Sequence, residues 1–474
     1  MKTNQIQLPK RLGILIAFVG LGGCASTAVN LHSSVDDFSQ AKLGAAVKMQ
    51  RSANDRAAAL SMARTRLEQP LAREDAVRLA LSLSPAFQAL LADSASSAAG
   101  AAQSARLTNP IFTFERLTRR DAGGLDIDIG RMLSVSLLEL IYLPSRIKAA
   151  DAMQVQVNLR AAASAVETVT NVRQAWVRAV AAQQSVGYVT QVMEAAEASA
   201  ELAKRMYKVG NFSQLQRARQ QAFYAEATAQ LARAKQNAMN TREQLIRQLG
   251  LDDDLADKLV LPARLPDLPQ TILTEAVIAQ SALAERLDIR IATAELDAVA
   301  ARNGFKQATS FVNAFHLAGV SNSETGKPRQ RGYELELMLP VFDWGDARRE
   351  QSSAEYAAAM QRVYQTAVDA SSSVREQYAG YRTSHALANH YRNEIVPLRK
   401  LIADEMLLKY NGMLTGVFDL LAETRSQISS VVLAIDAERD FWLADAALHA
   451  TLLGKPTSGV NMTMSAAADG AAAH

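Results

Sequence analysis

Cysteine, aromatic residues and enzyme motifs are scarce in this sequence. Its 474 residues include one cysteine, Cys24, so no disulfide or cysteine-based metal site can form within a chain. Hydrophobic residues make up 49% but aromatic residues only 6%, and alanine, which favours closely packed helices, supplies much of the difference. The sequence has no Gly-x-Ser-x-Gly elbow and no P-loop, and His385 and His390 lack the i, i+4 spacing of a helical zinc motif. We therefore expect a protein that is not an enzyme and holds no metal or other cofactor.

Residues 1–23 predict a cleaved secretion signal. Lys2, Lys10 and Arg11 form its basic start, and the apolar stretch at 12–21 is too short to span a bilayer. The signal holds three of the 51 basic residues and none of the 48 acidic ones, so the mature chain is formally neutral. Because a neutral chain has no excess of positive charge, we expect no nucleic-acid partner.

The segment Leu21-Gly22-Gly23-Cys24 resembles a bacterial lipobox. In that resemblance, Cys24 becomes the first residue of the mature protein and carries covalent lipid. Ala25 follows it in place of aspartate, which in bacterial lipoprotein sorting favours the outer membrane. The alternative is a plain cleaved signal with an incidental cysteine. Residues 24–72 are polar and show little pattern, so we expect an extended, lipid-anchored tether.

The chain repeats itself after about 200 residues, a period much longer than the 20–50 residues of a solenoid unit. Four pairs of segments carry the repeat: Asp75-Ala76-Val77 and Glu275-Ala276-Val277, Val172-Arg173 with Trp176 and Val374-Arg375 with Tyr378, Tyr207 and Tyr410, and Leu249-Gly250 and Leu453-Gly454. We infer two pseudo-equivalent halves, residues 73–251 and 274–455, joined by a proline-containing linker at 252–273. Residues 456–474 are expected to form a disordered tail.

Each half is predicted to run in the same order: amphipathic helix, two strands, long helix, turn, long helix. The first half has a helix pair at 73–107 broken at Pro85, then strands at 111–115 and 133–137. No proline occurs between Pro144 and Pro262, so we expect Pro144 to close the second strand and a helix to span 145–206. A turn at 207–211 and a second helix ending at Leu249 complete this half.

The second half has predicted strands at 311–320 and 333–339, closed by Pro340, and Pro397 predicts a kink in its long helix. The last strand alternates, with Tyr333, Leu335 and Leu337 on one face and Glu334 and Glu336 on the other. One face suits lipid and the other suits water. The alternative, by pattern alone, is an ordinary half-buried sheet.

Strands that cross a bilayer must close into a barrel, because open edges leave backbone groups unpaired in lipid. Four strands are too few, since bacterial barrels begin at about eight. We therefore expect three chains to share one 12-stranded transmembrane β-barrel, continued on the periplasmic side by a long α-helical coiled-coil barrel. The fold class is mainly α with a small β part, built from the duplicated repeat.

A ten-residue segment where the last strand meets the next long helix resembles a motif of the TolC-like outer membrane factors. It reads Leu339-Pro340-Val341-Phe342-Asp343-Trp344-Gly345-Asp346-Ala347-Arg348. The resemblance, which covers about residues 73–455, implies a homotrimeric duct of an efflux or type I secretion system in the outer membrane, with its helices in the periplasm. It also implies a periplasmic adaptor partner and an inner-membrane transporter of the resistance–nodulation–division, ABC or major-facilitator class.

The resemblance also assigns roles at the ends of the two hairpins. Tyr207 and Gly210 match the family's turn at the periplasmic tip, and Tyr410 matches a tyrosine that holds the entrance closed. Asp419 matches an acidic position that rings the entrance and favours cations. The alternatives are a helix-packing aromatic for Tyr410 and a solvated helix-start acid for Asp419. The sequence departs from the family pattern at three places: Gln216, Met413 and Thr415.

Three questions stay open at this stage. A periplasmic adaptor lipoprotein is the alternative function, although one hairpin flanked by many short strands would be expected of it. The substrate class, whether metal, drug or protein, does not follow from the sequence; the lipobox and short loops resemble the heavy-metal branch of the family. Met462, Met464 and His474 in the tail are either soft-metal contacts or flexible filler.

Overall fold

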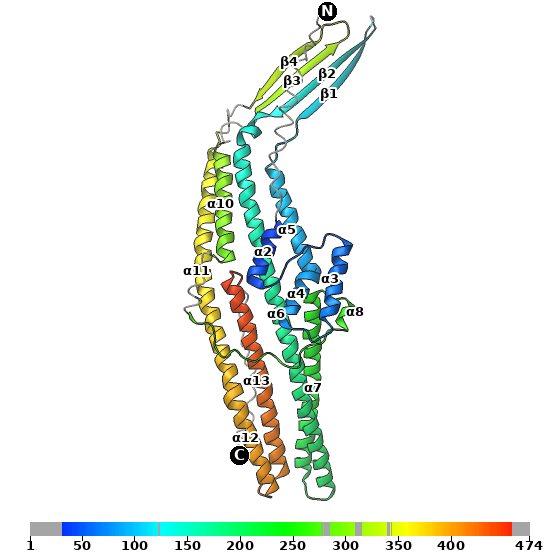
Figure 1. Cartoon of the computed structure of the whole chain (residues 1–474), viewed down its shortest axis with the longest axis vertical. Helices are drawn as coiled ribbons and strands as arrows, with labels where there is room; N and C mark the ends of the chain where they lie inside the picture. The colour runs from blue at the N-terminus through cyan, green and yellow to red at the C-terminus, as the bar shows by residue number, and fades with distance from the viewer. Residues whose placement is uncertain are drawn as a thin grey trace, which may run out of the picture. The chain divides into compact units, whose positions relative to one another are not determined.

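The computed structural model describes residues 31–121, 124–275, 278, 285–308, 315–338, 342 and 344–456 (Figure 1). The predicted signal, Cys24, the first part of the tether and nearly all of the predicted tail lie outside these residues. The chain divides into two compact units. We call the one comprising Asp93–Asn158 and Ile291–Gln365 the sheet unit. The other comprises His32–Ala92, Leu159–Arg290 and the chain from Thr366 onward, and we call it the hairpin unit.

The sheet unit contains one antiparallel sheet of four strands in the order β1-β2-β3-β4. The strands are β1 (Ile111–Asp121), β2 (Gly124–Ser136), β3 (Phe315–Glu324) and β4 (Gln330–Leu337). Both predicted strand pairs are present and lie in one sheet, with β2 paired to β3 across the two halves. The first pair is much longer than the predicted 111–115 and 133–137, because both strands continue toward their connection. This pairing joins residues far apart in the sequence, such as Asp128 and Glu324, which are 196 positions apart.

Helices make up most of the remaining described chain. They are α2 (Leu31–Leu43), α3 (Ala53–Arg66), α4 (Arg73–Leu83), α5 (Pro85–Ser104), α6 (Leu137–Lys208), α7 (Gln214–Leu249), α8 (Asp253–Ala256), α10 (Leu287–Ala308), α11 (Asp346–His390), α12 (Val396–Asn411) and α13 (Val417–Leu452). The predicted break at Pro85 and the predicted end at Leu249 are both confirmed. Among the described helices, none has the length and hydropathy needed to cross a membrane.

The hairpin unit is built from two long helical hairpins, α6 with α7 and α12 with α13 (Figure 1). Small side chains let the helices approach closely: Ala196 on α6 and Ala227 on α7 are both buried in one cluster. A second cluster centres on Phe441 and Leu448 of α13 and on Tyr381 and Ala388 of α11. Within one chain, buried small side chains therefore hold neighbouring helices together, and the coiled-coil barrel of three chains stays a prediction.

Each half ends on a glycine that packs against the start of its own half. Gly250 has φ of +71° and Gly454 has φ of +84°, a conformation that favours glycine. A Cβ on Gly250 would lie 2.6 Å from Pro85 Cδ, and one on Gly454 would lie 2.6 Å from the backbone nitrogen of Leu287. These contacts leave no room for a side chain, so the two Leu-Gly pairs of the repeat are positions of close backbone approach.

The linker between the halves is fastened along its length. Leu259 and Leu265 are buried, and Arg242 donates hydrogen bonds of 2.8 Å to the backbone oxygens of Leu259 and Ala256. Further along, Trp442 donates to the backbone oxygen of Pro266. The prolines keep this stretch out of long helices, but its backbone oxygens serve as acceptors for side chains of both halves.

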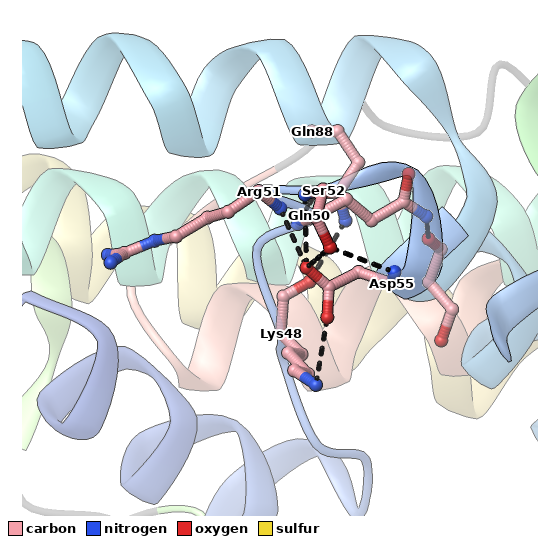
Figure 2. Close-up of polar contacts among 7 residues, drawn as sticks. Lys48, Gln50, Arg51, Ser52, Asp55 and Gln88 are labelled. Atoms are coloured by element: carbon pink, nitrogen blue, oxygen red, sulfur yellow. Dashed lines mark hydrogen bonds and ion pairs between the residues drawn. The ribbon is translucent and has the colours of Figure 1, made fainter. Parts of the chain in front are cut away.

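The expected extended conformation of the tether is wrong for residues 31–66, which form α2 and α3. Ser52 and Asp55 form a capping box at the start of α3 (Figure 2). Bonds from the Ser52 hydroxyl and the Arg51 backbone, with Lys48 alongside, lower the pKa of Asp55 to about 2. Gln88 of α5 accepts from the backbone nitrogen of Gln50 and donates to the backbone oxygen of Lys48. The capping box is local, whereas the contacts of Gln88 join residues about 40 positions apart, which the periodicity of the sequence does not reveal.

The two predictions made at Pro144 need correction, whereas the one at Pro397 does not. Strand β2 ends at Ser136, and α6 begins at Leu137 and contains Pro144, so Pro144 does not close a strand and the helix does not begin at 145. A proline in the helix interior forfeits one backbone hydrogen bond, which the rest of this very long helix tolerates. At Pro397, a π-helical turn at Tyr391–Ile395 comes directly before α12. The predicted interruption of the helix is therefore present.

Candidate functional site

The tip of the first hairpin is a tight turn between Lys208 and Gln214. Gly210 has φ of +79°, which only glycine adopts without strain. Ser213 caps α7, because its hydroxyl accepts from the backbone nitrogen of Gln216 at 3.2 Å. In return, Gln216 Oε1 accepts from the backbone nitrogen of Ser213 at 2.9 Å. A neutral side chain therefore completes the cap of the first tip.

The second tip repeats this turn with different residues. Met413 has φ of +60°, the left-handed conformation that Gly210 adopts in the first tip. Asp419 Oδ2 accepts from the backbone nitrogen of Gly416 at 3.3 Å and from Thr415 Oγ1 at 3.1 Å. Asp419 thus does for α13 what Gln216 does for α7, and Thr415 holds its carboxylate. An acidic residue at the first turn also suits the positive end of the helix dipole.

The two tip tyrosines have different surroundings. The guanidinium of Arg217 lies 4.4 Å from the ring centroid of Tyr207, in cation–π geometry. Leu420 stands at the matching position of the second half, and no cation of the described residues lies over the ring of Tyr410. Tyr410 is 39% exposed, and within the described chain its hydroxyl has no hydrogen-bond partner. The ring of Tyr410 is the one that is free to contact other groups.

The two tips touch each other and present apolar side chains. The rings of Phe212 and Phe418 are 4.6 Å apart between centroids. Beside them, Met413 is 94% exposed and Leu414 is 79% exposed. Val209 of the first tip is exposed as well. An apolar cluster at the end of two hairpins is typical of an interaction surface.

The four strands of the sheet unit give it two chemically different faces. Glu115, Asp126, Asp128, Glu324, Glu334 and Glu336 all lie on one face by their register, and we call this the acidic face. The other, the apolar face, carries Phe112, Leu133, Val135, Leu317, Tyr333, Leu335 and Leu337. A Cβ on Gly130 would lie 3.4 Å from Glu115 Cβ and 3.6 Å from Asn322 Oδ1, so these two side chains flank that glycine on the acidic face.

The sequence pattern found only part of this arrangement. The alternation of β4 correctly predicted that Tyr333 and Leu335 share a face opposite Glu334 and Glu336. Reasoning from sequence missed the contribution of the first half to the acidic face. The signal was present in Asp126 and Asp128, which are two residues apart as period-two alternation requires.

The structure places the proposed gate residues on the second tip and the tip-turn residues Tyr207 and Gly210 on the first, as the repeat predicts. It brings the tips together through Phe212 and Phe418, which the sequence analysis did not single out. Exposed aromatic residues Phe342 and Trp344 lie between β4 and α11. They belong to the motif that carried the family resemblance, most of whose first half lies outside the described residues.

Comparison with known proteins identifies the fold. The Campylobacter jejuni CmeC outer membrane channel matches with a TM-score of 0.68 at 15% identity, covering 81% of this chain and 86% of that one. The open state of the Neisseria gonorrhoeae MtrE outer membrane channel matches with a TM-score of 0.64 at 18% identity, covering 83% of this chain and 91% of that one. The outer-membrane channel OprN matches with a TM-score of 0.66 at 18% identity, covering 82% of this chain and 92% of that one. No family model and no curated protein matches the sequence. The fold, mainly helical with four antiparallel strands, is that of TolC-family channels.

Proposed function

We propose that this chain is the outer-membrane exit duct of a tripartite efflux system and that it works as a homotrimer. The observation that carries the proposal is the sheet, whose acidic face suits water and whose apolar face suits lipid. Its fold likeness to three outer-membrane channels supports the same conclusion. The duct performs no chemistry; it maintains an aqueous path.

The open edges of the sheet argue for several chains. Strands β1 and β4 are the edges of the sheet within one chain. In lipid, the free N–H and C=O groups of an edge strand need partners, and only closure supplies them. If β4 of one chain pairs with β1 of the next, three chains close a 12-stranded barrel. The helical hairpins then form the periplasmic part of the duct.

The hairpin tips form the periplasmic entrance in this proposal. Threefold assembly brings three Asp419 carboxylates into one ring, which attracts cations and repels anions. Tyr410 narrows the same opening, because its ring is exposed and has no cation stacked on it. The exposed apolar residues Met413 and Leu414 fit the end of a periplasmic adaptor, which links the duct to an inner-membrane RND, ABC or major-facilitator transporter.

A lipid on Cys24 anchors the amino terminus at the outer membrane in this proposal, after removal of residues 1–23. The clasp of Gln88 on Gln50 and Lys48 supports such an anchor, because it fixes the first described segment to the helices of the hairpin unit. Membrane attachment then pulls on a folded segment. Metabolic labelling with a palmitate analogue in wild type and Cys24→Ala tests this point.

The alternatives differ in architecture and in cargo. A periplasmic adaptor lipoprotein is disfavoured by the fold, which matches channels over about four fifths of this chain. A type I secretion duct shares the fold, so only cargo separates it from an efflux duct. Heavy metals and drugs are both compatible with an acidic water-lined face.

Two measurements test the proposal. The mass of the detergent-purified protein should be that of a trimer, and a monomer that inserts no channel into planar bilayers would overturn it. A clean deletion strain is then exposed to metal ions and to dyes, detergents and antibiotics. Sensitivity to copper, silver, zinc, cobalt or cadmium alone assigns metal efflux, and sensitivity to the drugs assigns multidrug efflux. Loss of a secreted protein without any sensitivity assigns secretion and contradicts efflux.

A further inference from the structure

Most arginines of the sheet lie on the face opposite the acidic residues. Arg116, Arg120, Arg131 and Arg331 lie on the apolar face, and only Arg119 among the strand arginines lies on the acidic face. No acidic residue of these strands whose side chain is described lies on the apolar face. Charges on a lipid-facing surface are costly, so an uncompensated basic group there needs an explanation.

Arg116, Arg131 and Arg331 lie close to one level of the apolar face, whereas Arg120 lies further along β1, opposite Leu125. The register aligns Phe114, Arg131, Ser321 and Arg331 in a single row across all four strands. Arg116 lies two residues after Phe114 on β1, on the same face and diagonal to Arg131. Such diagonal neighbours are about 7–8 Å apart. Arg131 and Arg331 are two strands apart, which is about 10 Å at the usual strand spacing.

A fourth arginine reaches this level from the connection before β4. Arg329 Nε donates a 3.1 Å hydrogen bond to Ser321 Oγ, and Ser321 stands in the row between Arg131 and Arg331. We call Arg116, Arg131, Arg329 and Arg331 the arginine belt. In the described chain, the guanidinium groups of Arg116, Arg131 and Arg331 have no ion-pair or hydrogen-bond partner.

The belt lies at the border of the apolar zone. On the side toward the helices, the next row contains Phe112, Leu133, Gly319 and Tyr333, and the rows beyond it contain only apolar residues such as Leu335 and Leu337. On the other side, toward the β1–β2 and β3–β4 connections, the same face is mixed: Thr118, Arg120 and Ser323 are polar, whereas Ile127 and Ile129 of β2 are apolar. Tyr333, 83% exposed, stands beside Arg331, and an aromatic residue next to a charge is typical of a membrane interface.

We propose that the arginine belt binds the phosphate groups of an anionic glycolipid in the outer leaflet of the membrane. The proposal rests on the proposed function, because the apolar face must meet lipid and the hairpin connections must face outward. Guanidinium forks bind phosphate oxygens in pairs, and a belt without carboxylates leaves them available. Like charges at this spacing repel one another, so a bound phosphate removes repulsion as well as adding bonds.

The experiment measures lipid retention by the full-length protein purified in detergent. Native mass spectrometry counts bound bisphosphorylated lipid A, with monophosphoryl lipid A as the competing probe. We expect wild type to retain the bisphosphorylated form in preference. The double variant Arg131→Gln with Arg331→Gln should retain it about tenfold less, as the loss of charge-assisted bonds predicts. Arg131→Lys with Arg331→Lys, which keeps both charges, should lose less.

Arg119→Gln is the matched control, because Arg119 lies in the same strand as Arg116 but on the acidic face. Its lipid retention should equal that of wild type. Unchanged retention in the double glutamine variant, equal loss in Arg119→Gln, or no preference for the second phosphate would each overturn the inference. Single-channel recordings of every variant distinguish a failure of the lipid-binding inference from a failure of the proposed duct. If the wild-type protein forms channels but shows no lipid preference, the lipid-binding role of the belt is refuted and the duct is not. If the wild-type protein forms no channel, the duct itself is refuted.

Discussion

The indole nitrogen of Trp176 donates a 2.8 Å hydrogen bond to the backbone oxygen of Leu71. The hydroxyl of Tyr378 donates at 3.2 Å to the backbone oxygen of Leu273, and both residues of this pair lie 202 positions after their counterparts. In each half, an aromatic side chain on the long helix fastens the segment that enters that half. The duplication therefore extends to the polar contacts that position the incoming chain.

Tyr378→Phe removes the hydroxyl and leaves the Leu273 oxygen without this donor. We expect the free energy of unfolding to fall by about 1 kcal/mol, the net value of such a hydrogen bond. Denaturant unfolding of the purified protein measures it. Tyr364→Phe, at an exposed position of the same helix, is the control and should change nothing. Equal stability of the Tyr378 variant and the control would show that the contact is dispensable.

Met413→Gly should stabilise the second tip. A non-glycine residue at φ of +60° costs about 1–2 kcal/mol, and glycine at that position avoids most of this cost. Hydrogen exchange of the Leu414 amide, which donates to the backbone oxygen of Lys409 at 2.8 Å, reports the local opening. Hydrogen exchange of the Leu414 amide should be slower in Met413→Gly than in wild type. In Gly210→Ala, exchange of the amides in the first tip should be faster than in wild type. Faster exchange in Met413→Gly would mean that the methionine side chain holds the turn.

Asp419→Gln should lower the cation preference of the channel. The glutamine keeps the helix cap, as Gln216 shows by accepting from the Ser213 backbone at 2.9 Å, and removes one charge from each subunit. Reversal potentials in a salt gradient measure the preference. Gln216→Glu adds an acid at the equivalent position of the first tip and should raise it. Unaltered reversal potentials in Asp419→Gln would limit Asp419 to capping α13.

Tyr410→Ala should increase the conductance of the resting channel, because the ring is exposed and no cation of the described chain is stacked on it. Tyr207→Ala is the matched control. Its ring lies under Arg217 at 4.4 Å, so its removal should leave the resting conductance unchanged. Planar bilayer recordings compare the two. A larger conductance in both variants, or in neither, would contradict a gate specific to Tyr410.

Glu74 should make stability depend on pH. Burial raises the pKa of Glu74, but the charges and hydrogen bonds of Arg173 and Arg73 outweigh it and lower the pKa below 4.5. A lowered folded-state pKa contributes stability above the unfolded value and loses it as the pH falls through the folded value. The carboxylate is half exposed, so Glu74→Gln should cost at most about 1 kcal/mol at pH 7. The difference should shrink as the pH falls below 4.5 and through the lowered folded-state pKa, while the exposed control Glu243→Gln should show no such trend.

The sequence by itself determined the features that depend on near neighbours. The break at Pro85, the positive φ at Gly210 and Gly250, and the alternating faces of β4 all follow from local backbone preferences. The repeat also predicted two hairpins, because each helix-forming stretch between turns is long and rich in alanine.

Only the tertiary structure decided which residues meet. The row that aligns Arg131 with Arg331 depends on the register of β2 and β3, which pair across nearly 200 residues. Gln88 fixes the backbone of Lys48 and Gln50, and the course of the linker depends on Arg242 and Trp442. Periodicity reports which face of its own strand or helix a residue occupies, but partners distant in sequence are selected by packing and hydrogen bonding in the whole fold.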